Sequence, residues 1–155
     1  MMRPARTVIF FLATFAFAAV ATAAPPPPAG WVEEPAAEGT LHTLRHGESQ
    51  AGLQVSRVQL ESADVERFQR NLQQQLAADG IEIEAPAAAQ SFAGHPGTVT
   101  RYTKTVLDIQ FTILVVDVHH KNSLLHAVAW LRPTDEISED ALEKDVLSYV
   151  VSLVK

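Results

Sequence analysis

The spacing of apolar residues divides the chain into alternating and helical stretches. Residues 41–45 and 53–60 alternate apolar with polar positions, as strands do, and turn-forming residues separate them. These two segments predict a β-hairpin. The next apolar positions fall three or four apart, which predicts a helix that Ser62 or Asp64 caps and that ends at Gly80.

The second half of the chain repeats the change from strands to helix. Residues 81–84 alternate like an edge strand that Pro86 ends, and the glycine-rich stretch after it is expected to be a loop. Three further strands are predicted, at residues 98–105, from 107 or 108 to 119, and at 124–131. Lys121 and Asn122 fall where a tight turn joins the last two strands.

A final amphipathic helix is expected after Pro133, with Ser138 as its cap. Its inward residues are expected to be Leu142, Val146, Val150 and Leu153. Because strands joined by short turns run antiparallel, the order predicts an α+β fold. In it, an antiparallel sheet of about five to six strands carries two amphipathic helices packed on one face.

The first 23 residues are typical of a secretory signal peptide. Arg3 and Arg6 form a basic start, residues 7–20 are apolar, and a small-residue step precedes a cleavage site near Ala23. A Pro- and Ala-rich linker is predicted for residues 24–39 and a single domain for residues 40–155. The leader indicates a periplasmic or secreted protein, and no later apolar run is long enough to predict membrane insertion after cleavage.

Charge and cysteine content exclude several classes of function. Removing the leader moves the net formal charge from −6 to −8, and an acidic surface of that kind repels nucleic acid. The chain has no cysteine, which excludes thiol catalysis, disulfide exchange and thiolate metal sites. No cofactor-binding motif and no signature of a hydrolase or nucleotide-binding protein occurs in the sequence.

A set of short motifs resembles the DcrB/PsbP-like superfamily, small exported or lipid-anchored domains of Gram-negative bacteria. The motifs are SFAGHPGT at residues 91–98, a strand containing Tyr102, a long apolar hairpin, Pro133, and a closing helix that ends LSYVVSLVK. The similarity spans roughly residues 40–155. The chain lacks the anchoring cysteine of the lipid-anchored members. The resemblance implies an accessory, assembly or chaperone-like binding protein rather than an enzyme, and it carries over no catalytic residues.

One histidine cluster is a candidate metal site. If the turn centres on Lys121 and Asn122, Asp117 lies opposite His126, and His119 shares the strand face of Asp117. Asp117, His119 and His126 could then converge on one zinc or copper ion. The alternative is a polar sheet end where the carboxylate and the histidines pair with each other and with water.

Two surfaces are candidates for binding a protein partner. Beyond Gln110 and Thr112, the strand predicted there is apolar on both faces. A sheet covered by helices on one side is therefore expected to leave an apolar face open, unless the linker with Trp31 or the loop around Phe92 lies over it. The acidic run from Asp135 to Asp145 could steer a basic partner, or could be a solvated helix face. His42, His46 and His95 are interpreted as turn and strand residues without a site.

The sequence therefore predicts a periplasmic non-enzymatic binding protein that acts through protein–protein contact in the cell envelope. An accessory or assembly factor and an immunity-type inhibitor of a toxic enzyme both fit this description. The alternative is a periplasmic module that binds a metal ion or a small ligand through Asp117, His119 and His126. An enzyme is not expected, because no set of nucleophile, base and oxyanion donors can be named.

Overall fold

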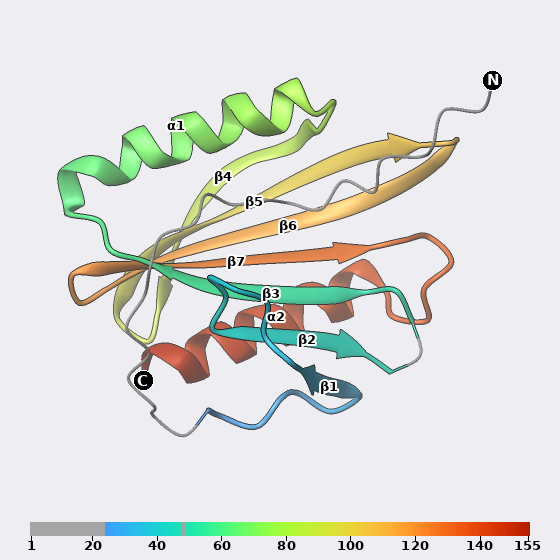
Figure 1. Cartoon of the computed structure of the whole chain (residues 1–155), viewed down its shortest axis with the longest axis horizontal. Helices are drawn as coiled ribbons and strands as arrows, with labels where there is room; N and C mark the ends of the chain where they lie inside the picture. Colours follow the sequence, from blue (N-terminus) through green and yellow to red (C-terminus); the bar gives the residue numbers. More distant parts are fainter. Residues whose placement is uncertain (1–23, 48) are drawn as a thin grey trace.

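The computed structural model describes residues 24–47 and 49–155, and the expected leader lies outside them. The described elements follow the order β-β-β-α-β-β-β-β-α (Figure 1). They are β1 (Trp31–Glu34), β2 (His42–His46), β3 (Gly52–Val58), α1 (Ser62–Ala78), β4 (Glu82–Phe92), β5 (His95–Val106), β6 (Ile109–His120), β7 (Ser123–Leu131) and α2 (Glu139–Val154).

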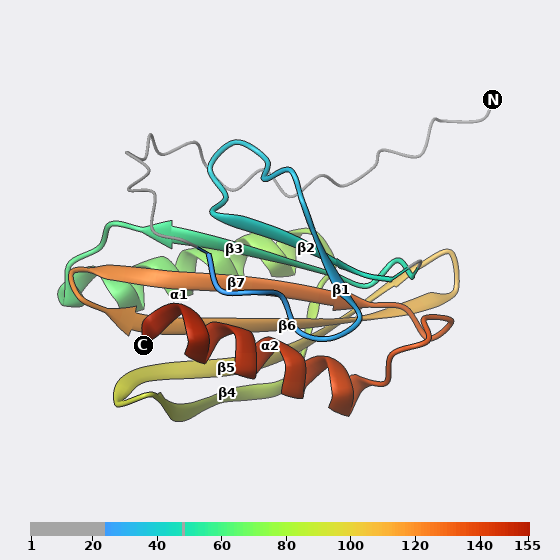
Figure 2. The same cartoon turned by 90° about the horizontal axis from the view of Figure 1, so that it is seen from below.

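All strands join one antiparallel sheet of seven, in the order β1-β2-β3-β7-β6-β5-β4. The two helices lie on opposite sides of this sheet, as the two views in Figures 1 and 2 show. The α+β class is consistent with the prediction. The predicted sheet of five to six strands and the packing of both helices on one face are wrong.

The central strands explain why helices cover both faces. In β6, Leu114, Val116 and Val118 point to the side of α2, hereafter the α2 face, whereas Ile113 and Val115 point to the opposite α1 face. All five side chains are buried. A strand that is apolar on both faces needs cover on both, and this sheet receives one helix on each.

The larger core lies on the α2 face. Helix α2 contributes buried residues that pack on β3, β6 and β7: Leu142, Val146, Tyr149, Val150 and Val154. Leu153, expected to point inward, is half-buried. Ser138 caps the helix as predicted, because its hydroxyl accepts a hydrogen bond from the backbone N–H of Ala141 at 3.2 Å.

Strand β1 comes from the segment predicted to be a linker. Trp31 folds back onto the domain edge, and only 6% of it is exposed. Its indole Nε1 donates a hydrogen bond to Oδ2 of Asp145 on α2 at 2.9 Å. This contact brings residues 31–34 alongside β2 and adds a strand to the predicted sheet.

Strand β4 runs through Pro86, so the predicted strand end and glycine-rich loop are wrong. The register with β5 shifts between Ile83 and Ala85 and again between Ala85 and Ala88. Pro86 lies in the second shift and has no paired residue on β5. Proline is tolerated here because β4 is an edge strand with one side unpaired. The hairpin closes at Ala93 and Gly94, both with positive φ, at 49° and 86°.

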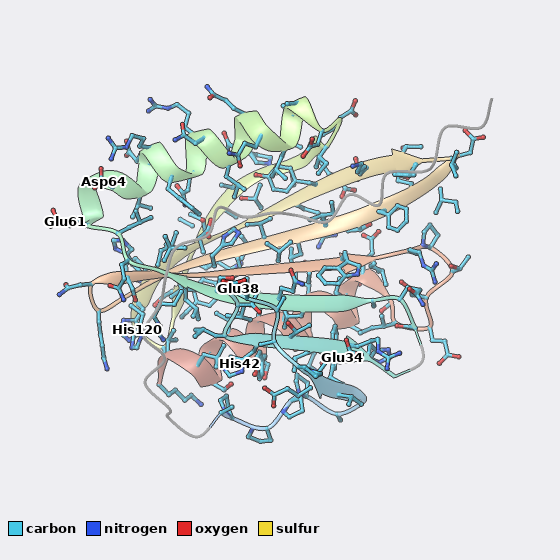
Figure 3. The ribbon with its side chains drawn as sticks, in the orientation of Figure 1. Glu34, Glu38, His42, Glu61, Asp64 and His120 are labelled. Atoms are coloured by element: carbon cyan, nitrogen blue, oxygen red, sulfur yellow. The ribbon has the colours of Figure 1, made fainter. Side chains whose placement is uncertain are left out.

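The other predicted turns and helix ends are largely confirmed. The β2–β3 hairpin forms, Lys121 begins the β6–β7 turn with φ 56°, and Gly80 follows α1 with φ 75°. The predicted cap of α1 is wrong, because the N-cap is Glu61, which Figure 3 labels just before the helix. The Glu61 side chain makes no capping hydrogen bond. In the described part of the chain, neither helix has the length and apolar content needed to cross a bilayer.

Candidate functional site

Helix α1 covers its face of the sheet with a small apolar cluster. Leu76 is buried, and Leu72 is half-buried beside it. The sheet residues beneath these leucines are Tyr102, Ile113 and Val115, with Val128 and Trp130 partly buried at the border. Beside this small cluster, the α1 face contains polar groups and a cavity.

The main polar feature on the α1 face is a buried carboxylate–histidine pair. Asp117 on β6 lies directly opposite His126 on β7, as the turn position predicted. Asp117 Oδ1 lies 2.6 Å from Nδ1 of His126, and His126 is only 1% exposed. The ring of Phe68 from α1 meets the imidazole edge-on at 5.6 Å between centroids. The pair is therefore enclosed between the sheet and the helix.

The pair belongs to a polar row that crosses four neighbouring strands. Ser56 on β3 lies opposite His126, and Thr98 on β5 lies opposite Asp117. From α1, Nε2 of Gln69 reaches Oγ1 of Thr98 at 3.4 Å. The order serine, histidine, aspartate matches that of a hydrolytic triad, but Nε2 of His126 is buried without a hydrogen-bond partner and so accepts no hydrogen bond from Ser56.

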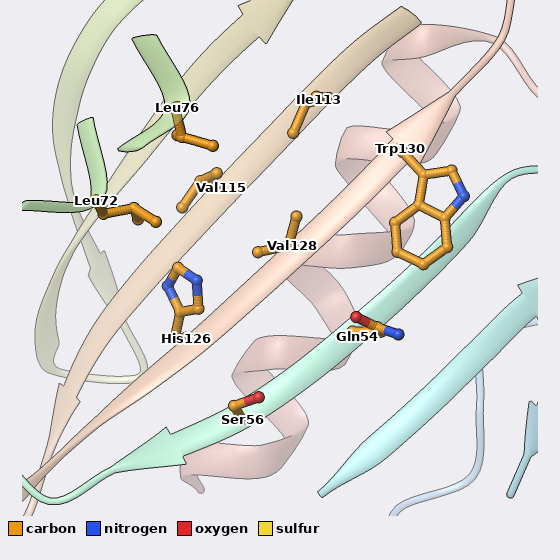
Figure 4. Close-up of a pocket in the computed structure, with 9 residues that line it drawn as sticks. All are labelled: Gln54, Ser56, Leu72, Leu76, Ile113, Val115, His126, Val128 and Trp130. Carbon is orange, nitrogen blue, oxygen red and sulfur yellow. The ribbon is translucent and has the colours of Figure 1, made fainter. Parts of the chain in front are cut away.

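A cavity of about 40 Å³ adjoins His126. Figure 4 shows its lining side chains converging from α1 and from strands β3, β6 and β7. The lining residues are Gln54, Ser56, Leu72, Leu76, Ile113, Val115, His126, Val128 and Trp130. The walls are apolar except for Gln54, Ser56 and His126, so the cavity combines an apolar surface with a few hydrogen-bonding groups.

The pKa of Tyr102 depends on burial and charge on the α1 face. Burial raises the pKa of the Tyr102 phenol, and the nearby negative charge of Asp117 raises it further. Both effects disfavour a second negative charge beside Asp117. The phenol of Tyr102 therefore stays protonated at neutral pH.

His119 does not join Asp117 and His126 in a metal-binding group. Across the residues that the structure describes, no three His, Asp or Glu side chains gather closely enough to hold a metal ion. His119 shares their strand face but lies opposite Leu124, and its Nε2 is buried without a partner. The structure thus brings together two of the three predicted ligands.

A second pair of histidines lies on the α2 face near the β6–β7 turn. The rings of His95 and His120 are perpendicular, with centroids 4.7 Å apart. Burial lowers the pKa of His120, and the nearby His95, Arg57 and Lys121 lower it further. His95 begins β5, in place of the turn position expected for it. These basic neighbours disfavour a bound cation here.

The remaining histidines pair with residues of β1. Nδ1 of His42 lies 3.2 Å from Oε1 of Glu33, at the place that Figure 3 marks on β2. His46 packs its ring against Trp31, with centroids 5.4 Å apart. Both histidines thus help to hold the edge strand.

The acidic run is largely used inside the protein. Arg101 pairs with Glu139 and Glu143, at 3.2 Å to Glu139. Asp145 accepts the hydrogen bond of Trp31, and Asp135 accepts backbone hydrogen bonds from Gln50 and Arg132. Because these four carboxylates have internal partners, the run is a weaker docking surface than its sequence indicates.

Three exposed apolar side chains lie together at the tip of the β5–β6 hairpin, and Val32 on β1 and Ile83 on β4 are exposed as well. We call Val106, Leu107 and Ile109 the hairpin-tip patch; they are 41%, 87% and 44% exposed. The expected open face is absent around Ile113 and Val115, because α1 covers them. Leu107 and Asp108 form the turn with φ of 49° and 63°. A two-residue turn with positive φ at both positions favours Asn, Asp or Gly, so leucine is unexpected.

Comparison with known proteins gives a likeness in fold only. No family model matches the sequence, and no curated protein is similar to it. A crystal structure of a protein from Bacteroides thetaiotaomicron matches with a TM-score of 0.53 and 10% identity. The match covers 78% of this chain and 41% of that one, so this chain spans less than half of its neighbour's length. PA94 of Pseudomonas aeruginosa, a protein of unknown function, matches with a TM-score of 0.46 and 11% identity, covering 88% and 86% of the two chains.

Proposed function

We propose that this protein is a non-enzymatic binding protein of the periplasm that holds a protein partner on the hairpin-tip patch. The apolar leader and the resemblance to the DcrB/PsbP-like superfamily support the location and the class. Accessory or assembly factors and immunity-type inhibitors are the roles that fit a small acidic protein of this kind.

Leu107 is the observation that carries the proposal. Its side chain is 87% exposed, and exposure of an apolar side chain to water is unfavourable. Its φ of 49° lies in the left-handed region, which a leucine adopts only at a cost in free energy. Neither solvation nor backbone geometry favours leucine here, which supports a role in contact. Val106 and Ile109 flank it, and a few clustered apolar residues can supply most of the energy of an interface.

The partner that fits this patch has an apolar pocket or groove bordered by basic residues. The turn places Asp108 beside the exposed apolar side chains. The whole chain carries a net formal charge of −6, which would steer a basic surface toward it.

The experiment replaces Leu107 in a way that should strengthen the fold and weaken the contact. Leu107→Asn suits the turn, so we expect the free energy of unfolding to rise by about 0.5–1 kcal/mol. In pull-downs from the envelope fraction of the native organism, the same variant should lose the main protein that the wild type captures.

The matched control is Val32→Asn, which alters an exposed apolar residue on β1 that is 54% accessible and lies outside the patch. It should retain the partner. Equal capture by the wild type and Leu107→Asn, or equal loss in both variants, would contradict the proposal.

A further inference from the structure

We infer that the cavity beneath α1 is a binding site for a small, uncharged apolar molecule with one hydroxyl group, and that this hydroxyl donates a hydrogen bond to Nε2 of His126. The site is separate from the hairpin-tip patch. The inference does not depend on the proposed protein partner.

The His126 ring needs a hydrogen-bond donor. The carboxylate of Asp117 can only accept, so the 2.6 Å contact assigns the ring proton to Nδ1. In this tautomer of the uncharged ring, Nε2 would present a lone pair, and this atom is buried without a partner. A buried acceptor without a donor is unfavourable, which makes Nε2 the polar anchor of the cavity.

The remaining walls select an apolar and uncharged body. Leucine, isoleucine and valine side chains and the indole of Trp130 form most of the lining, and no lysine or arginine is among the lining residues. A charged ligand would lack a counter-charge there. Gln54 and Ser56 lie at the same site and can accept or donate a second hydrogen bond to the hydroxyl.

Water is the competing occupant. One water needs about 10–15 Å³ of such space and two to four polar partners. The cavity of about 40 Å³ has room for water but mainly apolar walls. A ligand hydroxyl can donate to Nε2 while the rest of the ligand covers the apolar wall.

Movement of helix α1 can admit a ligand larger than the cavity. Its contacts over the cavity are the apolar side chains of Leu72 and Leu76. The hydrogen bond between Gln69 and Thr98 is long, at 3.4 Å, and the start of the helix has no side-chain cap. A small outward movement of α1 therefore breaks few polar contacts.

The test compares phenol with toluene, which has the same size but no hydroxyl. Binding is followed by the ¹⁵N resonance of His126 Nε2 and by the fluorescence of Trp130 in a Trp31→Phe background. Phenol should shift the His126 resonance and bind about 3- to 10-fold more tightly than toluene, as expected for one added hydrogen bond.

Three variants test whether the probes bind in this cavity and through His126. The double variant Asp117→Leu, His126→Leu removes both members of the pair, so no buried charge is left without a partner. It should bind phenol and toluene with about equal affinity. Val128→Phe fills the cavity and should abolish binding of both probes. His119→Leu removes a half-buried histidine outside the lining and should change neither affinity.

The inference is overturned if the wild type binds phenol and toluene equally, or if Val128→Phe leaves binding unchanged. It is also overturned if neither probe binds, because the cavity then holds only water. Circular dichroism and thermal melts of each variant confirm that a loss of binding is not a loss of the fold.

Discussion

Helices α1 and α2 have almost the same length, 17 and 16 residues, but they are attached to the sheet differently. Helix α2 lies on an extensive apolar core, has a hydroxyl cap from Ser138, and pairs Glu139 and Glu143 with Arg101. Helix α1 covers a small cluster, has no side-chain cap, and encloses a cavity with the Asp117–His126 pair. The α2 face therefore supplies most of the stability, and the α1 face is the one that can adapt to a ligand.

The strongest test of this comparison replaces one leucine of each helix with alanine. Leu142→Ala on α2 removes a side chain that is 1% exposed and should cost about 3 kcal/mol of unfolding free energy. Leu72→Ala on α1 removes a half-buried side chain at the cavity and should cost about 1 kcal/mol. Urea unfolding measures both values. Equal losses would show that the two helices are held equally well.

Changing the helix caps should have a smaller effect. Ser138→Ala removes the hydroxyl that accepts from Ala141 N–H and should destabilise the protein by about 1 kcal/mol. Glu61→Asp gives α1 a better cap at its N-cap position and should stabilise it by about 0.5–1 kcal/mol. Thermal melts of both variants provide the measurement. A loss with Glu61→Asp would mean that α1 is already optimally capped.

The two tyrosines give the smallest effect at neutral pH, and each face has one of them. Burial raises the pKa of Tyr149 on the α2 face to about 12, with a further contribution from the charge of Glu33. The pKa of Tyr102 on the α1 face is raised as well. The native state therefore binds more protons than the unfolded state above the ordinary value of 10.0, so stability is constant below it and falls as pH rises toward 12.

This pH dependence can be measured by ultraviolet absorbance of tyrosinate and by urea unfolding at several pH values. The native protein should show no tyrosinate step at the ordinary value of 10.0. Tyr149→Phe should reduce the alkaline loss of stability and change stability at neutral pH by less than about 0.5 kcal/mol, because the Tyr149 hydroxyl is buried without a partner. A tyrosinate step at the ordinary pKa would contradict the burial of these rings.

Local sequence signals predicted much of the fold. The Lys121 turn, the glycine after α1 and the Ser138 cap each depend on residues close together in the chain, and each is confirmed. The strand in the supposed linker was missed because Trp31 is held by Asp145, which lies 114 residues away. The continuation of β4 was missed because the edge position allows Pro86, and edge positions depend on the whole topology.

The candidate site was predicted in part for the same reason. The register of one turn was enough to place Asp117 opposite His126. Ser56 and Phe68 were missed because β3 and α1 meet the pair through the tertiary fold. For Leu107, a local signal was present: an apolar residue before Asp108 in a hairpin turn is unusual, and this signal could have indicated the hairpin-tip patch.

The two outer strands determine how another chain can approach this molecule. Strand β1 has only four residues, and β4 contains Pro86, two register shifts and the charged Glu82 and Glu84. Short, irregular and charged edges are poor templates for an added strand, so they oppose β-augmentation and amyloid-like stacking. A partner must therefore be recognised through side chains on a face or a hairpin, and fibril formation from the native state is disfavoured at both ends of the sheet.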